Sequence, residues 1–335
     1  MESVKNAIEI RNVTKDYGDF KLDSITFDVP EGSVCGFIGQ NGAGKTTTIK
    51  LLLDVRAKDA GEIFVFGRDM SKESAAVRED IGVVFDEMGF NEYLTAKDIN
   101  IIMRNIYKNW DEKVFFDYLK RFALPTKKKC GDFSRGMRMK LQIAVALSHN
   151  AKLLVMDEPT SGLDPIVRHE ILEIFREFVL EEDHTILLST HITSDLEQIA
   201  DEIVFINAGK IVLKGNKDEL IEKHGILRCK KDERSKISDS LIVSEEDNSF
   251  GIQLLVNDRE ACEKLYPKCV IEPATIEQIM LGYVSSPKRG YGHERTDNKR
   301  SDELSKEACR CGICYRYCSH SGGHVQYQCQ IRQSP

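Results

Sequence analysis

The sequence predicts an α/β fold built on a parallel sheet, and three observations lead to it. Short apolar runs typical of strands alternate with segments of helical periodicity over residues 33–213. A glycine-rich turn, GQNGAGKT at residues 39–46, connects an apolar strand to a helix. A second apolar run, residues 153–156, ends in the carboxylates Asp157 and Glu158. This order is typical of an α/β core with a parallel sheet.

The elements follow one another along the chain. The expected strands cover residues 7–13, 20–29, 33–38, 62–67, 81–85, 153–156 and 185–189, with a strand pair over 202–213. The expected helices follow the glycine-rich turn and cover residues 134–148, 165–181 and 193–200. Helical spacing of apolar residues over 91–124 interrupts the alternation and predicts a separate helical lobe at about residues 87–150.

The chain beyond residue 225 predicts two further parts. Apolar runs at 241–243 and 251–256, and a helix at about 275–283, predict a small accessory α+β domain over residues 226–284. From residue 285 aliphatic residues become scarce, and Ser, Gly, Arg and Cys become frequent. A segment of this composition, residues 285–335, is expected to be a disordered tail.

Length, composition and charge limit the possible functions. The 335 residues suffice for about two domains, and 41% hydrophobic with 30% charged residues is usual for a globular protein. The net charge is −7, and because the tail holds nine basic and five acidic residues, the preceding chain carries −11. That chain lacks the basic excess of nucleic-acid-binding proteins. No apolar run approaches the ~18 residues of a membrane span, and the N-terminus has no apolar signal core, so a cytoplasmic location is expected.

The glycine-rich turn predicts a phosphate-binding loop, because it fits G-x-x-x-x-G-K-[ST] between a strand and a helix. Glycines let successive backbone N–H groups surround phosphate oxygens, and the helix adds the positive end of its dipole. Lys45 is expected to reach the β- and γ-phosphates, and the Thr46 hydroxyl to bind Mg²⁺. The alternative is a glycine-rich turn that binds no ligand. The expected nucleotide-binding residues here are Gly39, Gln40, Asn41, Gly42, Ala43, Gly44, Lys45, Thr46 and Thr47.

The two carboxylates after the second apolar run predict catalytic groups. Asp157 is expected to hold Mg²⁺, directly or through water. Glu158 is placed to polarise the attacking water as a general base. A solvated acidic turn is the alternative, and the phosphate loop upstream favours the catalytic interpretation.

Together these motifs resemble the ATP-binding subunit of an ATP-binding-cassette (ABC) transporter, over about residues 9–215. Ser161–Pro165 matches the D-loop of that family, and His191 matches the switch histidine that contacts the γ-phosphate. Tyr17 matches the aromatic residue that stacks on adenine. Phe133–Met137 falls where the family's signature sequence, commonly LSGGQ, begins a helix.

Two positions depart from the family pattern. Arg135 and Met137 stand where the common signature has Gly and Gln. Ser134 and Gly136 are retained, and the serine hydroxyl with the helix N-terminus can still face a phosphate. Asp86 stands where the family usually has Gln; it can bind a Mg²⁺-linked water, but it adds negative charge near the phosphates. Both variants resemble those in exporter ATPases of the ABC-2 type, such as bacitracin-resistance and lantibiotic-immunity ATPases.

The resemblance implies a P-loop ATPase cassette with a RecA-like core in residues 1–225, which includes the helical lobe. It implies ATP and Mg²⁺ as ligands, and a head-to-tail dimer, formed with a second copy or a paralogous ATPase, that encloses two ATP molecules. A separate ABC-2 type membrane permease would hold the chain at the inner face of the membrane and choose the substrate. The implied catalytic residues are Lys45, Glu158 and His191; the metal ligands Thr46, Asp86 and Asp157; and the further nucleotide contacts Tyr17, Asp86, Ser134, Gly136 and Asp164.

Two other functions remain to be weighed. A soluble ABC ATPase that acts on nucleic acid or ribosomes would usually have paired cassettes, long coiled coils or basic surfaces, and this sequence has none of these. A regulatory nucleotide-binding subunit with little hydrolysis is disfavoured by Glu158 and His191. His149, His169 and His184 are expected at surface or helix positions rather than in a site.

The tail leaves three interpretations open. One C-x₂-C pair among its cysteines, with nearby histidines, is a weak pattern for zinc ligands. A disordered extension and an out-of-frame reading of the end of the gene are the alternatives. The residues concerned are Cys309, Cys311, Cys314, Cys318, His320 and His324.

Overall fold

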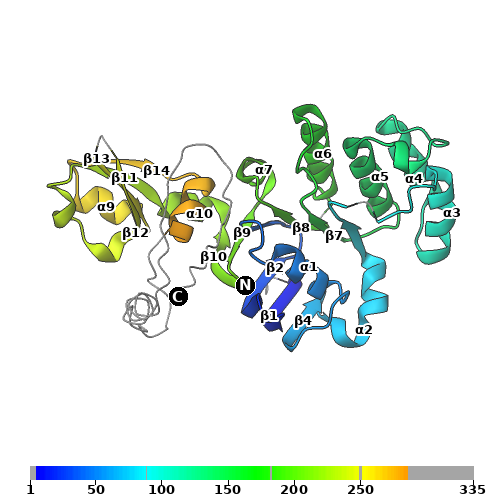
Figure 1. Cartoon of the computed structure of the whole chain (residues 1–335), viewed down its shortest axis with the longest axis horizontal. Coiled ribbons are helices and arrows are strands. Elements are labelled where there is room, and N and C mark those ends of the chain that lie inside the picture. The colour runs from blue at the N-terminus through cyan, green and yellow to red at the C-terminus, as the bar shows by residue number, and fades with distance from the viewer. Residues whose placement is uncertain (1–4, 88, 182, 249–250, 286–335) are drawn as a thin grey trace, which may run out of the picture. The chain divides into compact units, whose positions relative to one another are not determined.

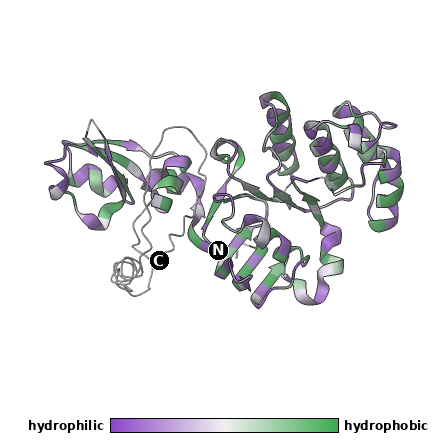
Figure 2. Ribbon diagram, in the orientation of Figure 1, coloured by the Kyte–Doolittle hydropathy of each residue, from purple (hydrophilic) through white to green (hydrophobic). Residues whose placement is uncertain are grey.

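A computed structural model describes residues 5–87, 89–181, 183–248 and 251–285 (Figure 1). In this part of the chain the strands form three sheets, of four, six and four strands. The longer helices, such as α5 and α6, carry both hydrophobic and hydrophilic residues, and the strands of the six-stranded sheet are largely hydrophobic (Figure 2). The tail and the zinc interpretation of its cysteines and histidines lie outside the described residues.

The six-stranded sheet confirms the predicted α/β class. Its order is β10 (Lys210–Asn216), β9 (Glu202–Asn207), β3 (Val34–Ile38), β8 (Thr185–Thr190), β7 (Leu153–Asp157) and β6 (Ile81–Val84). All pairs are parallel except the β9–β10 hairpin. Strands β3, β7 and β8 are buried along their whole length, as expected for a parallel sheet covered on both faces. The carboxyl ends of β3, β8 and β7 therefore lie side by side.

A separate antiparallel sheet forms from three strands that the sequence predicted but could not assign to a sheet, together with the two-residue strand β5, which was not predicted. Its order is β2 (Lys21–Pro30), β1 (Asn6–Asp16), β4 (Ala60–Val65) and β5 (Arg68–Asp69). Buried and exposed residues alternate along most of β2, so one face packs on the core, where Phe27 stacks on Phe37 of β3 at 5.3 Å. Helix α1 (Lys45–Leu52) joins this core through Ile49 and Leu52, and α2 (Met70–Val77) through Met70 and Val77. Helix α2 was not predicted; it is short and has a non-helical residue at Glu73.

The predicted helical lobe contains three helices. The segment 91–124, whose apolar residues have helical spacing throughout, forms two of them. The three helices are α3 (Ala96–Ile106), α4 (Glu112–Arg121) and α5 (Arg135–Leu147). A Thr95–Asp98 capping box begins α3, and the Asp111 side chain caps α4, so residues 107–111 separate the two. Phe115 and Leu119 of α4 are fully buried in the lobe. These two residues thus belong to the core of the lobe.

Two helices follow strands β7 and β8. Helix α6 (Pro165–Phe178) ends three residues before the expected residue 181, and Val179 is its C-cap. The ring of His184 lies at this end of the helix, with Nδ1 3.0 Å from the Phe178 carbonyl oxygen. Helix α7 (Thr193–Ile199) follows His191. Leu196 and Ile199 of α7 pack in the main hydrophobic cluster.

After β10 the chain forms α8 (Lys217–Lys223) and then an antiparallel sheet with two helices, which is the α+β composition predicted for residues 226–284. These later elements are β11 (Gly225–Cys229), β12 (Ile242–Asn248), β13 (Gly251–Val256), α9 (Arg259–Leu265), β14 (Val270–Pro273) and α10 (Ile276–Ser285). The sheet order is β12-β13-β11-β14, and Ile276 and Ile279 of α10 join the hydrophobic cluster that contains Leu196 of α7. The sequence analysis missed β11, β14, α8 and α9, which are all short. Nowhere in the described ranges is a helix both long and apolar enough to cross a membrane.

His149 is fully buried, so the expectation of an ordinary surface or helix position was wrong for this residue. Its ring stacks on Tyr107 at 3.9 Å, and its Nδ1 and Nε2 lie 3.3 and 3.2 Å from the carbonyl oxygens of Val145 and Ile81. Burial lowers the pKa of His149, although the two carbonyl oxygens favour protonation. The unfolded chain therefore binds this proton more readily than the folded chain below about pH 6.5.

We expect the free energy of unfolding to fall as the pH drops from about 7.5 to about 5.5, because protonation of His149 favours the unfolded state. Urea unfolding at the two pH values measures the loss. His149→Gln should lose less stability than the wild type on acidification, whereas His169→Gln, at an exposed position, should behave as the wild type. An equal loss in all three proteins would contradict this role of His149.

Candidate functional site

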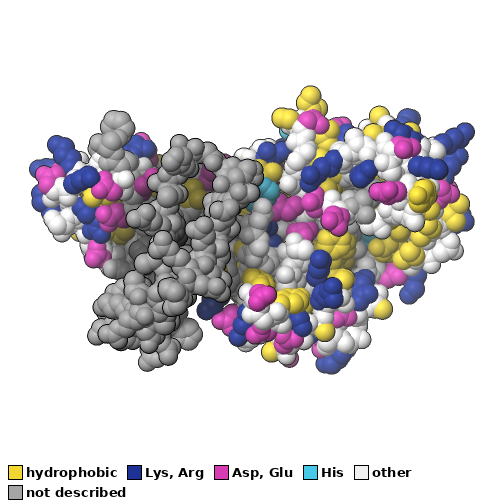
Figure 3. All heavy atoms as spheres, viewed as in Figure 1, with side chains coloured by type: hydrophobic (Ala, Val, Ile, Leu, Met, Phe, Trp, Pro, Cys, Tyr) yellow, Lys and Arg dark blue, Asp and Glu magenta, His cyan; other side chains and the backbone are white. Residues whose placement is uncertain are grey.

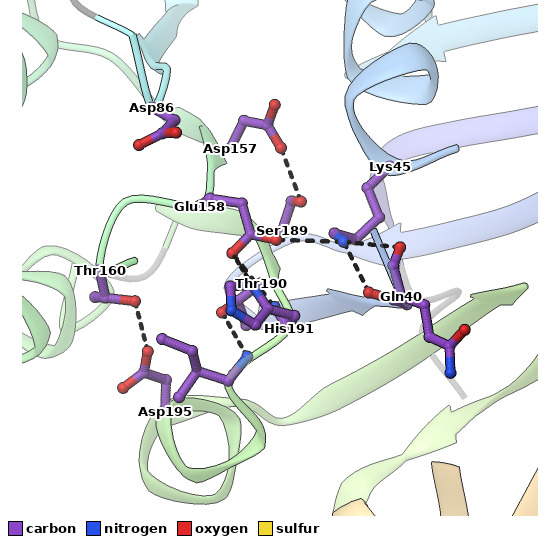
Figure 4. Close-up of polar contacts among 12 residues, drawn as sticks. Gln40, Lys45, Asp86, Asp157, Glu158, Thr160, Ser189, Thr190, His191 and Asp195 are labelled. Carbon is purple, nitrogen blue, oxygen red and sulfur yellow. Dashed lines mark hydrogen bonds and ion pairs between the residues drawn. The ribbon is translucent and has the colours of Figure 1, made fainter. Parts of the chain in front are cut away.

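The predicted catalytic residues meet at the carboxyl ends of β3, β7 and β8 (Figure 4). Lys45 begins α1 after the glycine-rich loop that follows β3. Asp157 ends β7, Glu158 follows it, and His191 follows β8. Because these strands are parallel neighbours, residues far apart in the sequence converge on one edge of the sheet.

The loop before α1 requires glycine at several positions. Gly42 and Gly44 have φ values of +81° and +116°, in the left-handed region. A Cβ on Gly39 would lie 2.4 Å from the carbonyl oxygen of Ile206, which leaves no room for a side chain. Gln40 and Asn41 are exposed and Ala43 is buried, with its N–H donating to the Gln40 carbonyl oxygen at 3.1 Å. This loop has the backbone conformation that a phosphate cradle needs.

Lys45 brings a buried positive charge to the loop. Its side chain is 6% exposed, and Nζ donates to the carbonyl oxygens of Gly39 at 2.7 Å and Gln40 at 3.3 Å. Nζ also lies 3.2 Å from Oε1 of Glu158. The ammonium is thus held between the loop and the carboxylate of Glu158, at a place where it could neutralise phosphate charge.

Thr46 and Asp157 form a set of oxygen donors. The Thr46 hydroxyl donates to Asp157 Oδ2 at 2.6 Å, and the Ser189 hydroxyl donates to Oδ1 at 2.9 Å. A hydroxyl and a carboxylate are the hard ligands that Mg²⁺ prefers, so these residues fit the ion. The sequence analysis missed Ser189, which pairs in register with Asp157 across β7 and β8. Only the order of the strands reveals that contact.

Glu158 has the geometry of a general base. Its φ of +54° is unusual for a residue with a side chain, and such backbone strain is concentrated at functional sites. Oε2 lies 2.7 Å from His191 Nδ1, which orients the carboxylate. Oε1 is buried, and its neighbour among the described ion pairs is Lys45 Nζ at 3.2 Å. A carboxylate fixed by a histidine on one oxygen and a lysine on the other has the orientation that a general base needs.

We expect His191→Ala to lower ATP turnover by about 100-fold, because Glu158 loses the contact that orients it. ATP affinity should change little, since Lys45 and the loop remain. Phosphate release and nucleotide binding, measured separately, test both points. His169→Ala on the exposed side of α6 is the matched control, and wild-type turnover in His191→Ala would exclude the orienting role.

Tyr17 and Thr47 are two further residues expected to contact the nucleotide. Tyr17 follows β1 and is 49% exposed, with Lys15 Nζ 5.6 Å from its ring centroid. An exposed ring of this kind is free on one face to stack on a base. Thr47 is half-buried in the first turn of α1. Their nucleotide contacts stay predictions.

Residues of the signature sequence and of the D-loop line a pocket of their own, which includes none of Lys45, Glu158 and His191. A pocket of about 280 Å³ is lined by Ser134, Gly136 and Asp164, among other residues. Ser134 Oγ accepts from the Met137 N–H at 3.3 Å and so caps α5. Asp164 caps α6 by accepting from two backbone N–H groups, each at 3.1 Å. The exposed N-terminus of α5 therefore faces outward with its dipole available to an anion.

Asp86 is ion-paired with Arg135 of the signature sequence, and both side chains are about half-exposed. The pairing of these two residues was not predicted. Gln142, also missed, is buried and fixes the chain just before Asp86: its Nε2 donates to the Phe85 carbonyl oxygen at 3.1 Å, and its Oε1 accepts from the Phe85 N–H at 3.4 Å. The proposed role of Asp86 at the metal stays a prediction.

Known proteins resemble this chain in sequence and fold. The family model described as ABC transporter matches residues 22–161. Bacitracin transport ATP-binding protein BcrA of Bacillus licheniformis is 38% identical over 61% of this chain and 68% of its own length. Lantibiotic transport ATP-binding protein SrtF of Streptococcus pyogenes is 36% identical over 63% of this chain and 91% of its own. The solved structure of an ATP-binding subunit of an ABC transporter is 27% identical, with a TM-score of 0.59, over 64% of this chain and 91% of that one.

Proposed function

The chain belongs to the ABC transporter family, and from that premise we propose that it is the ATP-hydrolysing subunit of an exporter. The observation that carries the proposal is the convergence of Lys45, Glu158 and His191 at one edge of the parallel sheet, beside the Thr46–Asp157 pair. This constellation contains a phosphate cradle, a set of metal ligands and an oriented base. Those are the groups that nucleotide hydrolysis requires.

Each residue has a separate task in the proposed reaction. The loop N–H groups and Lys45 hold the phosphates of ATP and neutralise their charge. Thr46 and Asp157 hold Mg²⁺, which when bound withdraws negative charge from the phosphate oxygens. Glu158 accepts a proton from the attacking water, while His191 keeps its carboxylate in position. Catalysis then depends mainly on positioning and electrostatic stabilisation.

The proposed assembly contains two cassettes and a membrane permease. Ser134 and Gly136 lie at the exposed N-terminus of α5, apart from the contacts that Lys45 makes, which supports a role toward nucleotide on a second cassette. The second cassette is either another copy or a paralogous subunit. We propose that the permease is of the ABC-2 type and that it holds this chain at the inner face of the membrane. Bacitracin and lantibiotics, named in the relatives, are the first substrates to test.

The alternative of a soluble ATPase that acts on nucleic acid or ribosomes has less support. The relatives are named as transport proteins. On the face seen in Figure 3, basic and acidic side chains are interspersed, whereas nucleic-acid-binding proteins carry a basic patch or stripe.

Affinity purification of the tagged chain from detergent-solubilised membranes of the cells that encode it tests the proposal. A polytopic membrane protein should co-purify in stoichiometric amount, and the complex should hydrolyse ATP. The Lys45→Ala chain should still capture the same partner, because docking does not need the phosphate loop. Capture of ribosomes or nucleic acid instead would contradict the exporter function.

A further inference from the structure

The two residues that depart from the family pattern contact each other. Arg135, the third residue of the signature sequence, forms an ion pair with Asp86, which lies just beyond the end of β6. The residues are 49 positions apart, so the contact joins the signature helix α5 to the edge of the catalytic sheet. If either Asp86 or Arg135 were replaced by a neutral residue, the charge of the other would lose this ion pair.

The guanidinium of Arg135 also lies against the D-loop. A Cβ on Gly162 would come within 2.7 Å of Arg135 Nη1, so the glycine leaves the space that the arginine fills. Arg135 lines both neighbouring pockets, one of about 510 Å³ with Asp86 and one of about 280 Å³ with Ser134 and Gly136. A small movement of this side chain would therefore take it from the carboxylate toward the phosphate-facing end of the signature helix.

The pair is suited to being broken. Asp86 and Arg135 are 47% and 49% exposed, and an ion pair this exposed shifts an equilibrium by no more than about fivefold. A guanidinium binds phosphate oxygens in the same forked geometry as carboxylate oxygens. The γ-phosphate of ATP carries more negative charge than one carboxylate, so it competes for Arg135.

We propose that Arg135 and Asp86 form a latch on the signature sequence: Asp86 holds the guanidinium until the γ-phosphate of ATP on the opposite cassette replaces it. This inference rests on the proposed two-cassette ATPase. Arg135 is then a further phosphate-binding residue of the reaction. Asp86 acts against closure of the dimer, by occupying that residue within its own chain.

A double-mutant cycle on ATP-driven dimer formation tests the latch. The full chain carries Glu158→Gln so that ATP is not consumed, and light scattering gives the ATP concentration for half-maximal dimer at excess Mg²⁺. Asp86→Asn should lower that concentration about two- to fivefold, because Arg135 is released. Arg135→Gln should raise it, and Asp86→Asn should then cause no further shift in the Arg135→Gln background.

Glu177→Gln is the matched control, because it breaks a comparably exposed ion pair with Arg121 between α6 and α4. It should leave the midpoint unchanged. The latch is wrong if Asp86→Asn shifts the midpoint equally with and without Arg135, if it causes no shift with Arg135 present, or if Glu177→Gln has the same effect. If the Glu158→Gln parent forms no dimer with ATP, the two-cassette proposal fails, and the latch fails with it.

Discussion

Glu158→Gln is expected to lower ATP hydrolysis by about 10²–10⁴-fold while ATP binding persists. The amide has nearly the same shape as the carboxylate but cannot accept the proton of the attacking water. Lys45, Thr46 and Asp157, which are expected to hold the nucleotide and the ion, remain in place. Phosphate release gives the rate, and equilibrium binding of ATP gives the affinity.

Glu173→Gln provides the control for that substitution, because Glu173 lies on α6 and pairs only with Arg176 among the described ion pairs. It should hydrolyse ATP at the wild-type rate. Turnover near wild type in Glu158→Gln would show that another group activates the water. The strained backbone of Glu158 and the ion pair of its Oε1 with Lys45 would then need a different explanation.

Lys45→Ala should weaken ATP binding by about 100-fold and abolish measurable hydrolysis. The buried ammonium of Lys45 contacts the loop and would contact a bound phosphate. A hydrogen bond to a charged group contributes about 1.5–3 kcal/mol. Loss of the ammonium also leaves Oε1 of Glu158 buried without a positive neighbour within the described residues. Titration with ATP measures the affinity.

Lys50→Ala, at an exposed position of the same helix, is the control for Lys45→Ala and should bind ATP as the wild type does. Unchanged affinity in Lys45→Ala would count against the phosphate cradle. Loss of affinity in both variants would instead indicate damage to α1.

The phosphate loop and the two carboxylates could be predicted because the chemistry is local. Gly39–Thr46 and Asp157–Glu158 each follow an apolar strand, so sequence alone places them at strand ends. His191 was predicted only through the family resemblance. Ser189 and Gln142 required knowledge of which strands and helices are neighbours, and no local pattern singles them out.

The same limit explains the missed elements of the fold. Helices α2, α8 and α9 have seven or eight residues, too few for a clear helical period. The strands of the antiparallel sheet were visible as apolar runs, but their pairing with one another is a tertiary property. The Arg135–Asp86 contact is tertiary in the same sense, although both residues stood out in the sequence.

A mixture of two inactive chains tests directly whether one catalytic site takes residues from two cassettes, as proposed here for the dimer. Lys45→Ala removes the phosphate contact, and Ser134→Ala removes the signature hydroxyl; each chain alone should lose most of its activity. In a mixed dimer the Lys45→Ala chain still supplies an intact signature to the intact loop of the Ser134→Ala chain. The mixture should therefore hydrolyse ATP about tenfold or more faster than either chain at the same total concentration. A mixture no faster than the average of its two components would contradict a site shared between chains.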